Sequence, residues 1–416
     1  MTASLSDDAL LDLIQGRTLD YFTAFAHPVS GMARERSAGA FGYSALETVT
    51  TGGTGFGVMA LIAGAERGFI SRDAAVAQIA RIVGFLETAD RFHGVYPHFL
   101  DGSTGRTIPF SPLDDGGDLV ETSFLMAGLL AAREWVRSGE PNLAASIDAL
   151  WRAVEWSHHL RADGALLWHW SPVHGTAMNH AVRGWNECLI THVLAASSPT
   201  FPVAPETYHG SWATAPEFRN GKSYDGVVLP LGPDGGGPLF FAHYSFMGLD
   251  PRGLVDRYAD YFEQNRAHAL VNHAHCRRNP NGFAGYDEHC WGLTASDNHE
   301  GYNAHSPTND HGVITPTAAL ASFPYVPDLS MKAARHFHDR LGSTLFGTYG
   351  FLDAFNQGRD WVATSHLAID QGPIVVMIEN HRSGLLWSLF MRAPEVLRGL
   401  RRLGFASPHL ESTAIA

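Results

Sequence analysis

The feature that most constrains the fold is the regular return of helical segments of two different kinds. Gly53–Gly64 and Gly372–Ile378 are apolar or small on nearly every face, and a helix of this kind is buried on all sides. The segments 72–91, 143–160 and 252–272 instead combine an apolar face with an ordinary charged face. A ring of buried helices inside a ring of amphipathic helices predicts an all-α fold, the (α/α)6 barrel.

Helical periodicity predicts roughly twelve such segments, with ends placed to within a few residues. The first contains Leu10, Ile14 and Phe22 and is opened by Ser6. The alternation of buried and amphipathic segments is interrupted once, after the segment 181–195. No linker or composition break divides the chain, so residues 1–416 are interpreted as one domain. The other predicted helices are 53–67, 72–91, 118–137, 143–160, 181–195, 236–247, 252–272, 315–322, 328–341, 366–380 and 382–391.

Composition and charge argue against several classes of protein. The formal net charge is -13, with only 29 basic residues, whereas a protein that binds duplex nucleic acid needs a basic face. There is no run of about 18 apolar residues that would span a membrane, and no signal peptide is recognisable. Cys188, Cys276 and Cys290 form no disulfide framework. These features favour a reduced cytoplasmic protein, or a periplasmic one if the N-terminus was trimmed, and leave the oligomeric state undetermined.

Several buried helices are entered through a loop that contains glycine and, in most cases, an acid or amide. The loops are Gly52–Gly55, Asp114–Asp118, Asp234–Gly237 and Asp370–Gly372. If the inner helices run parallel, these loops gather at one end of the barrel. Glycine there lets a ligand approach the backbone, and helix N-termini attract anionic groups. The pattern favours a binding site at that end, although turn glycines and acidic caps alone would also produce it.

The densest group of acids lies in SPLDDGGDLVETSF, residues 111–124. The two glycines place Asp118 at or near a helix N-cap, and Glu121 follows three residues later on the same face. A capping arrangement explains this pair, but it does not require Asp114 and Asp115 in the preceding loop. Clustered carboxylates have the shifted pKa values that general acid–base catalysis needs. We therefore predict catalytic roles for Asp114, Asp118 and Glu121, with Asp115 binding substrate.

A lone acid occurs in RGWNECLI, residues 183–190. Glu187 has largely apolar neighbours, and burial of an unpaired carboxylate is costly unless it is protonated or paired. A raised pKa suits the general acid of glycoside hydrolysis at neutral pH. A salt bridge to Arg183, four residues earlier on the same helix face, is the alternative interpretation. The residues alone leave both interpretations open.

Aromatic residues near polar and glycine-rich loops provide surfaces on which sugars stack. A single aromatic residue is more often part of the core than of a binding site, because large rings dominate cores. The aromatic residues predicted to bind substrate are Trp168, Trp170, Trp185, Tyr244 and Trp291.

Two metal-binding interpretations fit the sequence poorly. The DDGGD stretch resembles the Asp-Asp-x-x-Asp magnesium motif of terpenoid synthases, but two glycines interrupt it. The second motif of those enzymes is not matched, because Val313 stands where Ser or Thr belongs after Asn309–Asp310. The densest group of the 23 histidines, near His273, His275 and Cys276, has the spacing of no zinc module. We predict no metal and no other cofactor.

Seven long motifs closely resemble the bacterial glucoamylase-like glycoside hydrolases, the group that contains the endo-β-1,2-glucanases. The resemblance extends roughly from Leu10 to Phe390. The motifs are GGTGFGVMALIAGAERGFI, DRFHGVYPHFL, SPLDDGGDLVETSFLMAGLL, RGWNECLITHVLAASSPT, GPLFFAHYSFMGLDPRGL, CWGLTASDNHEGYNAHSPTND and LAIDQGPIVVMIENHRSGLLW. The resemblance implies an (α/α)6 barrel that hydrolyses β-1,2-glucan and sophoro-oligosaccharides with inversion. It matches the family's acidic pocket to Asp114, Asp118, Glu121 and Glu187.

On this interpretation Glu187 is the general acid, and Glu121, or an Asp114–Asp118 pair acting through water, is the base. The exchange of the acid and base roles is the alternative assignment. Inverting glycosidases hold the two carboxyl groups roughly 6.5–9.5 Å apart. A transglycosylase, an exo-acting β-glucosidase-type hydrolase and a non-catalytic glucan-binding protein are the alternatives. The acidic cluster argues against a polysaccharide lyase. The remaining residues predicted to bind substrate are His169, Arg183, Asn186, Asp297, His305, Asn309 and Asp370.

Overall fold

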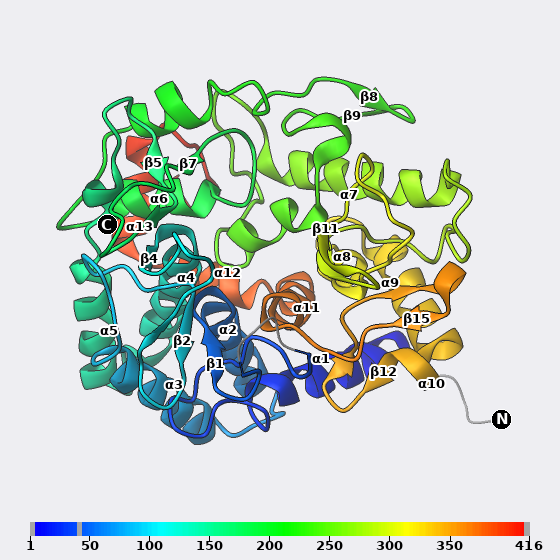
Figure 1. Cartoon of the computed structure of the whole chain (residues 1–416), viewed down its shortest axis with the longest axis horizontal. Coiled ribbons are helices and arrows are strands. Elements are labelled where there is room, and N and C mark those ends of the chain that lie inside the picture. Colours follow the sequence, from blue (N-terminus) through cyan, green and yellow to red (C-terminus); the bar gives the residue numbers. More distant parts are fainter. Residues whose placement is uncertain (1–4, 40–43, 412–416) are drawn as a thin grey trace.

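Six helical segments surround the centre of the molecule in the computed structural model, which describes residues 5–39 and 44–411 (Figure 1). Neighbours pack in the order α6, α4, α2, α11, α8. A short double turn, η4–η5, packs on α6 and closes the ring through a 3.0 Å hydrogen bond between His243 Nε2 and Ser322 Oγ. The inner segments are α2 Thr51–Glu66, α4 Leu119–Val136, α6 Leu189–Ser197, η4 Leu239–Ala242 with η5 Tyr244–Phe246, α8 Pro316–Leu320 and α11 Ala368–Arg382.

An outer helix packs against each inner segment, so the predicted all-α double ring is confirmed. The pairs are α1 with α11, α3 with α2, α5 with α4, α13 with α6, α7 with η4, and α9 with α8. The C-terminal α13, which the periodicity analysis missed, occupies the outer position on α6 and thereby explains the interruption in the alternation. The outer helices are α1 Asp7–Phe22, α3 Arg72–Leu86, α5 Pro141–Ala153, α7 Tyr261–Arg278, α9 Pro327–Arg335 and α13 Pro394–Arg402.

Short elements connect the helices. In the part of the chain that the structure describes, the strands form one three-stranded sheet, β1-β2-β3, and six two-stranded antiparallel pairs. The sheet consists of β1 Thr48–Thr50, β2 Phe99–Asp101 and β3 Thr107–Ile108, and the pairs are β4 Gly117–Asp118 with β6 His169–Trp170, β5 Leu166–Leu167 with β7 Ala181–Val182, β8 Ser223–Tyr224 with β9 Val227–Val228, β10 Ala295–Asn298 with β11 Gly301–Ala304, β12 Phe346–Gly347 with β13 Gly350–Phe351, and β14 Phe355–Asn356 with β15 Trp361–Val362. The remaining helices are α10 Gly342–Leu345, α12 Leu385–Phe390 and α14 Pro408–Glu411, and the short turns are η1 Trp156–His159, η2 Thr207–Trp212, η3 Asp234–Gly236, η6 His336–Arg340 and η7 Gln357–Arg359.

Three predicted helices differ most at their ends, and the segment predicted at 236–247 consists of the two short turns η4 and η5 and not of one helix. The segment predicted at 181–195 is helical only from Leu189, because residues 181–182 pair with β5 and Gly184 has φ +75°. The helix predicted at 252–272 begins at Tyr261, where the Asp260 carboxylate caps two backbone N–H groups. The segment 143–160 is helical at 141–153 and then continues in the separate turn η1. Local hydrogen bonding overrides the apolar periodicity in the first two segments.

Glycine lets the inner helices α2 and α4 approach backbone to backbone. A Cβ atom added at Gly128 would lie 2.1 Å from the carbonyl oxygen of Gly55, and one at Gly55 would lie 2.2 Å from the carbonyl oxygen of Phe124. Such distances are far inside van der Waals contact, and the obstructing atoms belong to backbone that cannot turn away. The glycine-rich, apolar sequence of the inner helices therefore has a packing origin.

This contact gives a prediction about stability. Gly128→Ala is expected to lower the free energy of unfolding by about 3 kcal/mol, because the helices must separate to admit the methyl group. Gly84→Ala in α3 is the matched control. No atom lies within 4 Å of its added Cβ, so relief from glycine's entropy cost is expected to stabilise the protein by about 0.5–1 kcal/mol. Urea denaturation measures both, and equal effects would contradict the packing explanation.

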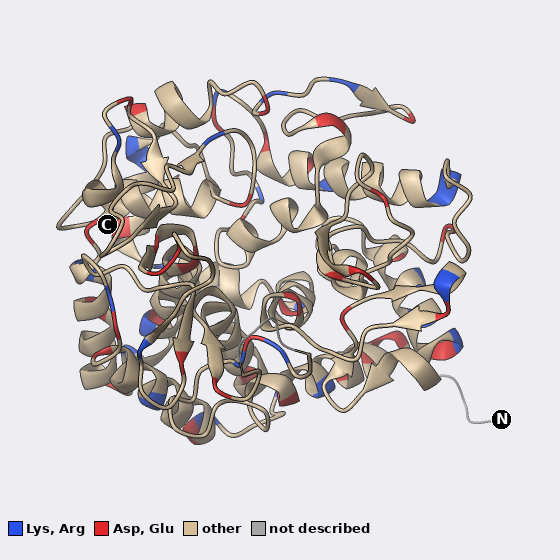
Figure 2. Cartoon of the chain, viewed as in Figure 1, with Lys and Arg blue, Asp and Glu red and all other residues tan. Residues whose placement is uncertain are grey.

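Charged residues are arranged unevenly over the fold (Figure 2). Lys and Arg lie mostly at the periphery, whereas acidic segments also occur near α4 and α11 in the middle of the view. No helix of the described residues is long and apolar enough to cross a membrane.

Candidate active site

A cavity of about 730 Å³ opens where several inner helices begin. It reaches the first turns of α4 and α11, the N-cap of α2 and the residue two positions before α6. Three of the four predicted loops thus meet at one end of the barrel. The fourth does not, because Asp234 is exposed and pairs with Lys222 at 3.0 Å. The cavity is lined by Glu35, Arg36, Thr50, His98, Phe99, Pro109, Phe110, Ser111, Asp114, Glu121, Phe124, Trp168, His169, Met178, His180, Glu187, Phe240, Tyr244, Ala295, Tyr302, Ala304, Leu367 and Ile369.

Asp118 is the predicted N-cap of α4, and it also holds two histidines. Its Oδ1 accepts the backbone N–H groups of Val120 and Glu121 at 3.0 and 2.9 Å. Its Oδ2 lies 3.0 Å from His98 Nδ1 and 3.4 Å from His169 Nε2. Burial alone would raise the pKa of Asp118, but the bonds from the two imidazoles outweigh burial and hold this pKa well below its usual range. Asp118 is therefore ionised and anchors the site.

The two histidines are held in the charged form by the acids around them. Burial alone would lower the pKa of each imidazole. For His98, the charges of Glu121, Asp118 and Asp114 outweigh burial and raise the pKa to about 9. For His169, which lies 2.9 Å from Asp114 Oδ2, the bonds to Asp114 and Asp118 raise the pKa to about 10. Two imidazolium ions thus balance part of the negative charge of the cluster.

One group of these atoms has the composition of a metal site. Ligand atoms of His98, Asp114 and Asp118 all lie within 4.8 Å of one another. A metal-bound imidazole must be deprotonated at its ligating nitrogen, whereas the raised pKa of His98 favours imidazolium. In this structure the imidazoles and carboxylates of the cluster are paired with one another.

Glu121 lies in the first turn of α4, and its side chain reaches the N-terminus of α2. Its Oε2 accepts the N–H of Gly52 at 2.7 Å. A Cβ atom at Gly52 would lie 2.4 Å from that same oxygen, so only glycine leaves room for the carboxylate. Burial raises the pKa of Glu121 to about 7, against the opposing effects of His98 and of the Gly52 N–H. Glu121 thus lies on the cavity wall, where the Gly52 N–H and His98 favour its ionised carboxylate.

Glu187 lies on the same cavity wall in the turn between β7 and α6, and 8% of it is exposed. Burial outweighs a backbone hydrogen bond that favours the charged form and, together with the charges of Glu121 and Asp118, raises its pKa to about 7. The alternative salt bridge to Arg183 is wrong. Arg183 is an exposed side chain that bonds Asp163 at 2.8 Å, because the helix that would have aligned it with Glu187 starts only at Leu189.

A second charged network lies behind another part of the cavity wall. Arg36 binds Glu35 through two nitrogens, at 2.7 and 3.1 Å, and binds Asp297 at 2.9 Å. The backbone N–H of Asp297 donates to Asp353 Oδ2 at 2.7 Å. The network joins residues that lie far apart in the sequence and borders the cavity at Glu35 and Arg36.

Asp353 and Asp370 form a buried carboxyl pair within this network. Burial raises the pKa of Asp353 to about 7 and the pKa of Asp370 well above its usual range. Neither carboxyl oxygen of Asp370 has a donor among the described residues. Adjacent carboxyl groups cannot easily both ionise, and the raised pKa values favour the neutral form within this pair, next to Ile369 of the cavity wall.

Aromatic rings complete the cavity. Trp168 stacks on His180 with ring centroids 4.9 Å apart, and Tyr244 stacks on Phe240 at 4.8 Å. Phe110 stacks on His98 and keeps 56% of its surface exposed. Exposed ring faces beside carboxylates and imidazoles suit a ligand with both apolar faces and hydroxyl groups, as a sugar has.

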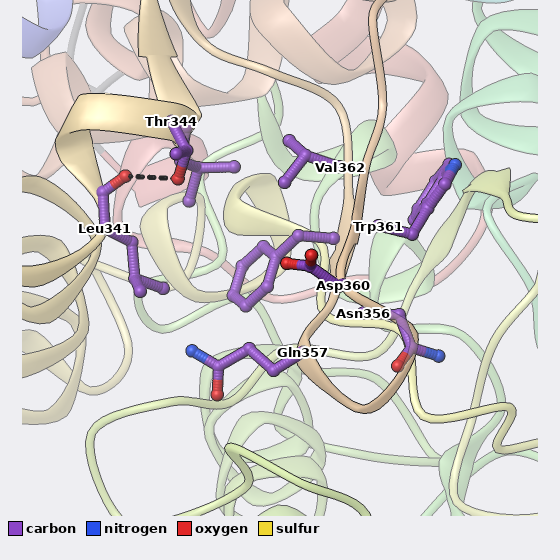
Figure 3. A pocket seen from close by; sticks show the side chains of 9 residues that line it. Leu341, Thr344, Asn356, Gln357, Asp360, Trp361 and Val362 are labelled. Atoms are coloured by element: carbon purple, nitrogen blue, oxygen red, sulfur yellow. Dashed lines mark hydrogen bonds between the residues drawn. The ribbon is translucent and has the colours of Figure 1, made fainter.

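A second cavity, of about 200 Å³, lies beside α10 and the β14–β15 hairpin (Figure 3). Thr344 Oγ1 donates to the Leu341 carbonyl at 3.1 Å on one side. Asp360 is the one acid among its nine lining residues. A pair of carboxyl groups, which hydrolysis of a glycosidic bond requires, is present in the larger cavity and not in this one.

Residues 179–394, just over half of the chain, match the protein family described as "Putative glucoamylase". The chain belongs to this glucoamylase-like family. The resemblance inferred from the motifs is thereby confirmed.

Two solved structures of similar proteins cover almost the whole chain. A Bacteroides uniformis protein with the same description is 55% identical, with a TM-score of 0.95, and the match covers 98% of this chain and 99% of that one. An endo-β-1,2-glucanase from Chitinophaga pinensis, solved with sophorotriose and glucose, is 50% identical, with a TM-score of 0.95. That match covers 98% of this chain and 100% of the glucanase. These similarities agree with the double ring.

A curated relative is longer than this chain. The exo-β-1,2-glucooligosaccharide sophorohydrolase (non-reducing end) of Parabacteroides distasonis is 45% identical over 427 residues. The match covers 97% of this chain but only 58% of that protein.

The cavity of this family member brings together many of the residues predicted from sequence. Catalytic candidates Asp114, Glu121 and Glu187 line it, as do Trp168, His169 and Tyr244 among the residues predicted to bind substrate. Asp118 lies directly behind the wall in contact with His98 and His169. Asp297 and Asp370 belong to the second charged network. Their roles stay predictions.

Two predicted sugar-binding tryptophans lie in the hydrophobic core instead. Trp185 is 2% exposed and stacks with Tyr261. Trp291 is fully buried and packs edge-on against His273. Both lie in motifs shared with the family, but each ring fills the interior, as the general preference of large aromatic residues would have suggested.

The other predicted residues also lie outside the cavity lining. Trp170 packs against His93 and His158 on the outer side of β6. Asn186 accepts the N–H of Cys188 at 3.0 Å and so shapes the turn that carries Glu187. The remaining predicted residues outside the lining are Asp115, Arg183, His305 and Asn309.

Sequence reasoning missed several residues of the site. His98 lies in the DRFHGVYPHFL motif, which was noted only as a family signature, and its contact with Asp118 is not readable from spacing. Phe110 is an exposed ring that lines the cavity, in a loop without a periodic pattern. Glu35 and Arg36 form an adjacent acid–base pair that carries no signal in a single sequence.

Proposed function

We propose that this protein hydrolyses β-1,2-linked glucan and sophoro-oligosaccharides, with Glu187 as the proton donor. The observation that carries the proposal is a buried Glu187 on the wall of a cavity that also exposes Glu121, Asp114 and sugar-sized aromatic surfaces. The substrate is inferred from the similar endo-β-1,2-glucanase and sophorohydrolase. Because this chain spans 58% of the sophorohydrolase, its choice between internal and terminal bonds is not carried over.

Glu121 and Glu187 have different surroundings, and these favour different catalytic roles for the two glutamic acids. Glu121 accepts the Gly52 N–H, and its charged form is also favoured by His98. For Glu187, the neighbouring charges of Glu121 and Asp118 act in the same direction as burial and favour the neutral form. Because the pKa of each glutamic acid is raised to about 7, the contacts guide the assignment: Glu121, whose carboxylate accepts the Gly52 N–H, is assigned as the base, and Glu187 as the acid.

Bond cleavage on this assignment needs no covalent intermediate. Glu187 donates its proton to the glycosidic oxygen, and a carboxylate on the wall takes a proton from the attacking water. Glu121 is our choice for that carboxylate, because it lines the same cavity and accepts the Gly52 N–H, which favours its charged form. Attack by water on the face opposite the leaving group inverts the anomeric carbon.

The activity should have a bell-shaped pH profile centred near pH 7. Above about pH 7, Glu187 loses the proton that the leaving group requires, because its pKa is raised to about 7. At lower pH, protonation of Glu121 removes the base. A pH profile of kcat on a sophoro-oligosaccharide measures both limbs. Activity that keeps rising to pH 9 would contradict the role of Glu187.

Product analysis tests the proposed reaction. The protein is incubated with linear β-1,2-glucan, sophoro-oligosaccharides, starch and laminarin, and products are followed by chromatography and by NMR of the newly formed anomeric centre. We expect shortening of the β-1,2-linked substrates alone, with an α-anomer formed first. Products longer than the substrate would indicate a transglycosylase. Release of glucose alone would indicate a β-glucosidase-type enzyme, and binding without products a glucan-binding protein.

A further inference from the structure

Three potential metal ligands meet at a place that is not part of the cavity lining. They are His93, before β2, Glu155, after α5, and His158 in η1. One ligand atom of each residue lies within 4.8 Å of the others. His93 Nδ1 is 3.0 Å from Glu155 Oε2, and the two imidazole rings stack with centroids 3.5 Å apart and planes at 13°.

Backbone bonds hold the three residues in place. The N–H of Glu155 donates to the His93 carbonyl at 2.9 Å, and the N–H of His158 donates to the Glu155 carbonyl at 2.9 Å. His93 has a φ of +54°, a left-handed conformation that is costly for a residue with a Cβ atom. Trp170 packs edge-on against both imidazoles, with centroids 5.0 and 5.4 Å away. These contacts fix the backbone of the three residues and bring their side chains together, and the partly exposed side chains keep some rotational freedom.

In the described part of the chain, the hydrogen bonds within this cluster leave several potential metal-ligand atoms without a bond. The bond to His93 uses one oxygen of Glu155, and both side chains are about one-third exposed to solvent. His158 Nε2 is shielded from solvent and has no hydrogen-bond partner among the described residues.

We propose that His93, Glu155 and His158 form a binding site for a divalent transition-metal ion of the Zn²⁺ type. Two imidazoles and one carboxylate are a ligand set that such ions accept, with water completing the coordination. Metal–nitrogen and metal–oxygen bonds of about 2.0–2.2 Å require ligand atoms somewhat closer together than the limit of 4.8 Å observed here. Small rotations of the partly exposed side chains supply this closure.

A bound ion would tie together two segments that support the catalytic cavity. His93 precedes the turn at Val95 and Tyr96, and the Tyr96 carbonyl accepts the N–H of Asp118 at 2.9 Å. On the other side, Trp170 follows His169, which contacts Asp114 and Asp118. The site is therefore structural in kind and lies behind the acid cluster, not within it. It does not depend on the proposed glucan hydrolysis.

Calorimetric titration of Zn²⁺ into metal-stripped protein without a histidine tag tests the site. We expect one tight site per chain in the wild type, and a Kd at least about ten-fold weaker in both His158→Ala and Glu155→Gln. His338→Ala is the matched control, since His338 also contacts a carboxylate, Asp339 at 2.8 Å, and its loss should leave the Kd unchanged.

Two results would overturn the proposal. One is the absence of stoichiometric Zn²⁺ binding to the wild type. The other is unchanged binding in His158→Ala and Glu155→Gln, which would place the ion elsewhere, for example at His98, Asp114 and Asp118. Thermal unfolding of the metal-free proteins checks that each variant is folded. Because a bound ion stabilises only the folded form, Zn²⁺ should raise the Tm of the wild type and of His338→Ala, but not of the other two variants.

Discussion

Glu187→Gln is expected to lower kcat on sophoro-oligosaccharides by about 10³-fold, because an amide cannot donate the proton that general acid catalysis supplies. The substitution keeps the size and burial of the side chain, so KM should change little. Steady-state kinetics at pH 7 measures both constants. Glu263→Gln is the control, because Glu263 is exposed on α7 and pairs only with Arg266 at 3.7 Å among the described ion pairs. This variant should match the wild type.

A substrate that needs no protonation separates a role in acid catalysis from a general defect. In an aryl sophoroside the leaving group is a nitrophenolate, which departs without being protonated. Glu187→Gln should therefore retain most of the wild-type activity on this substrate. Equal losses on the natural and the activated substrate would show that Glu187 has another role.

The same substitution should make the protein more stable at alkaline pH. The pKa of Glu187 is raised from 4.5 to about 7 in the folded state. The folded protein therefore binds the proton more tightly than the unfolded chain, and this contribution to stability is lost as the pH rises through 7. Glutamine has no charge to bury. We expect the difference in free energy of unfolding between Glu187→Gln and the wild type to shift by about 2 kcal/mol in favour of the variant from pH 5 to pH 8. Urea denaturation at the two pH values measures it.

Asp118→Ala is expected to lower the free energy of unfolding at pH 7 by about 4 kcal/mol. The substitution removes the cap of α4 and leaves His98 and His169 without their shared counter-ion, as happens when one partner of a buried ion pair is lost. Asp118→Asn should cost about 1 kcal/mol less, since its amide oxygen can still cap the helix. Urea denaturation compares the two.

Histidine titration provides an independent readout of this arrangement. NMR should show the pKa values of His98 and His169 falling below about 9 and about 10 in both variants. If Asp118→Ala is as stable as the wild type, or if both pKa values stay where they are, Asp118 does not organise the cluster.

Much of this acid cluster could be predicted from local sequence. Two glycines before Asp118 and a Glu three residues later determine a helix start, and the structure has the cap at that residue. The apolar, glycine-rich inner helices were equally predictable, because the close approach at Gly55 and Gly128 admits no side chain. In both cases the physical cause lies within a few residues or in the composition of one helix.

The remaining features depend on contacts that span the chain. Arg36 meets Asp297 across 261 positions, and α13 covers α6 although some 200 residues separate them. Neither pairing leaves a periodic signal. Trp185 and Trp291 lie in conspicuous motifs but are buried in the core. The motif alone does not distinguish a tryptophan that fills the core from one that binds a sugar.

The most direct test of the central proposal is chromatography of the products formed from linear β-1,2-glucan by the wild type and by Glu187→Gln at pH 7, with starch in parallel. The proposal predicts sophoro-oligosaccharides from β-1,2-glucan with the wild type, almost none with the variant, and no products from starch. Cleavage of starch, or undiminished cleavage of β-1,2-glucan by a folded Glu187→Gln, would contradict it.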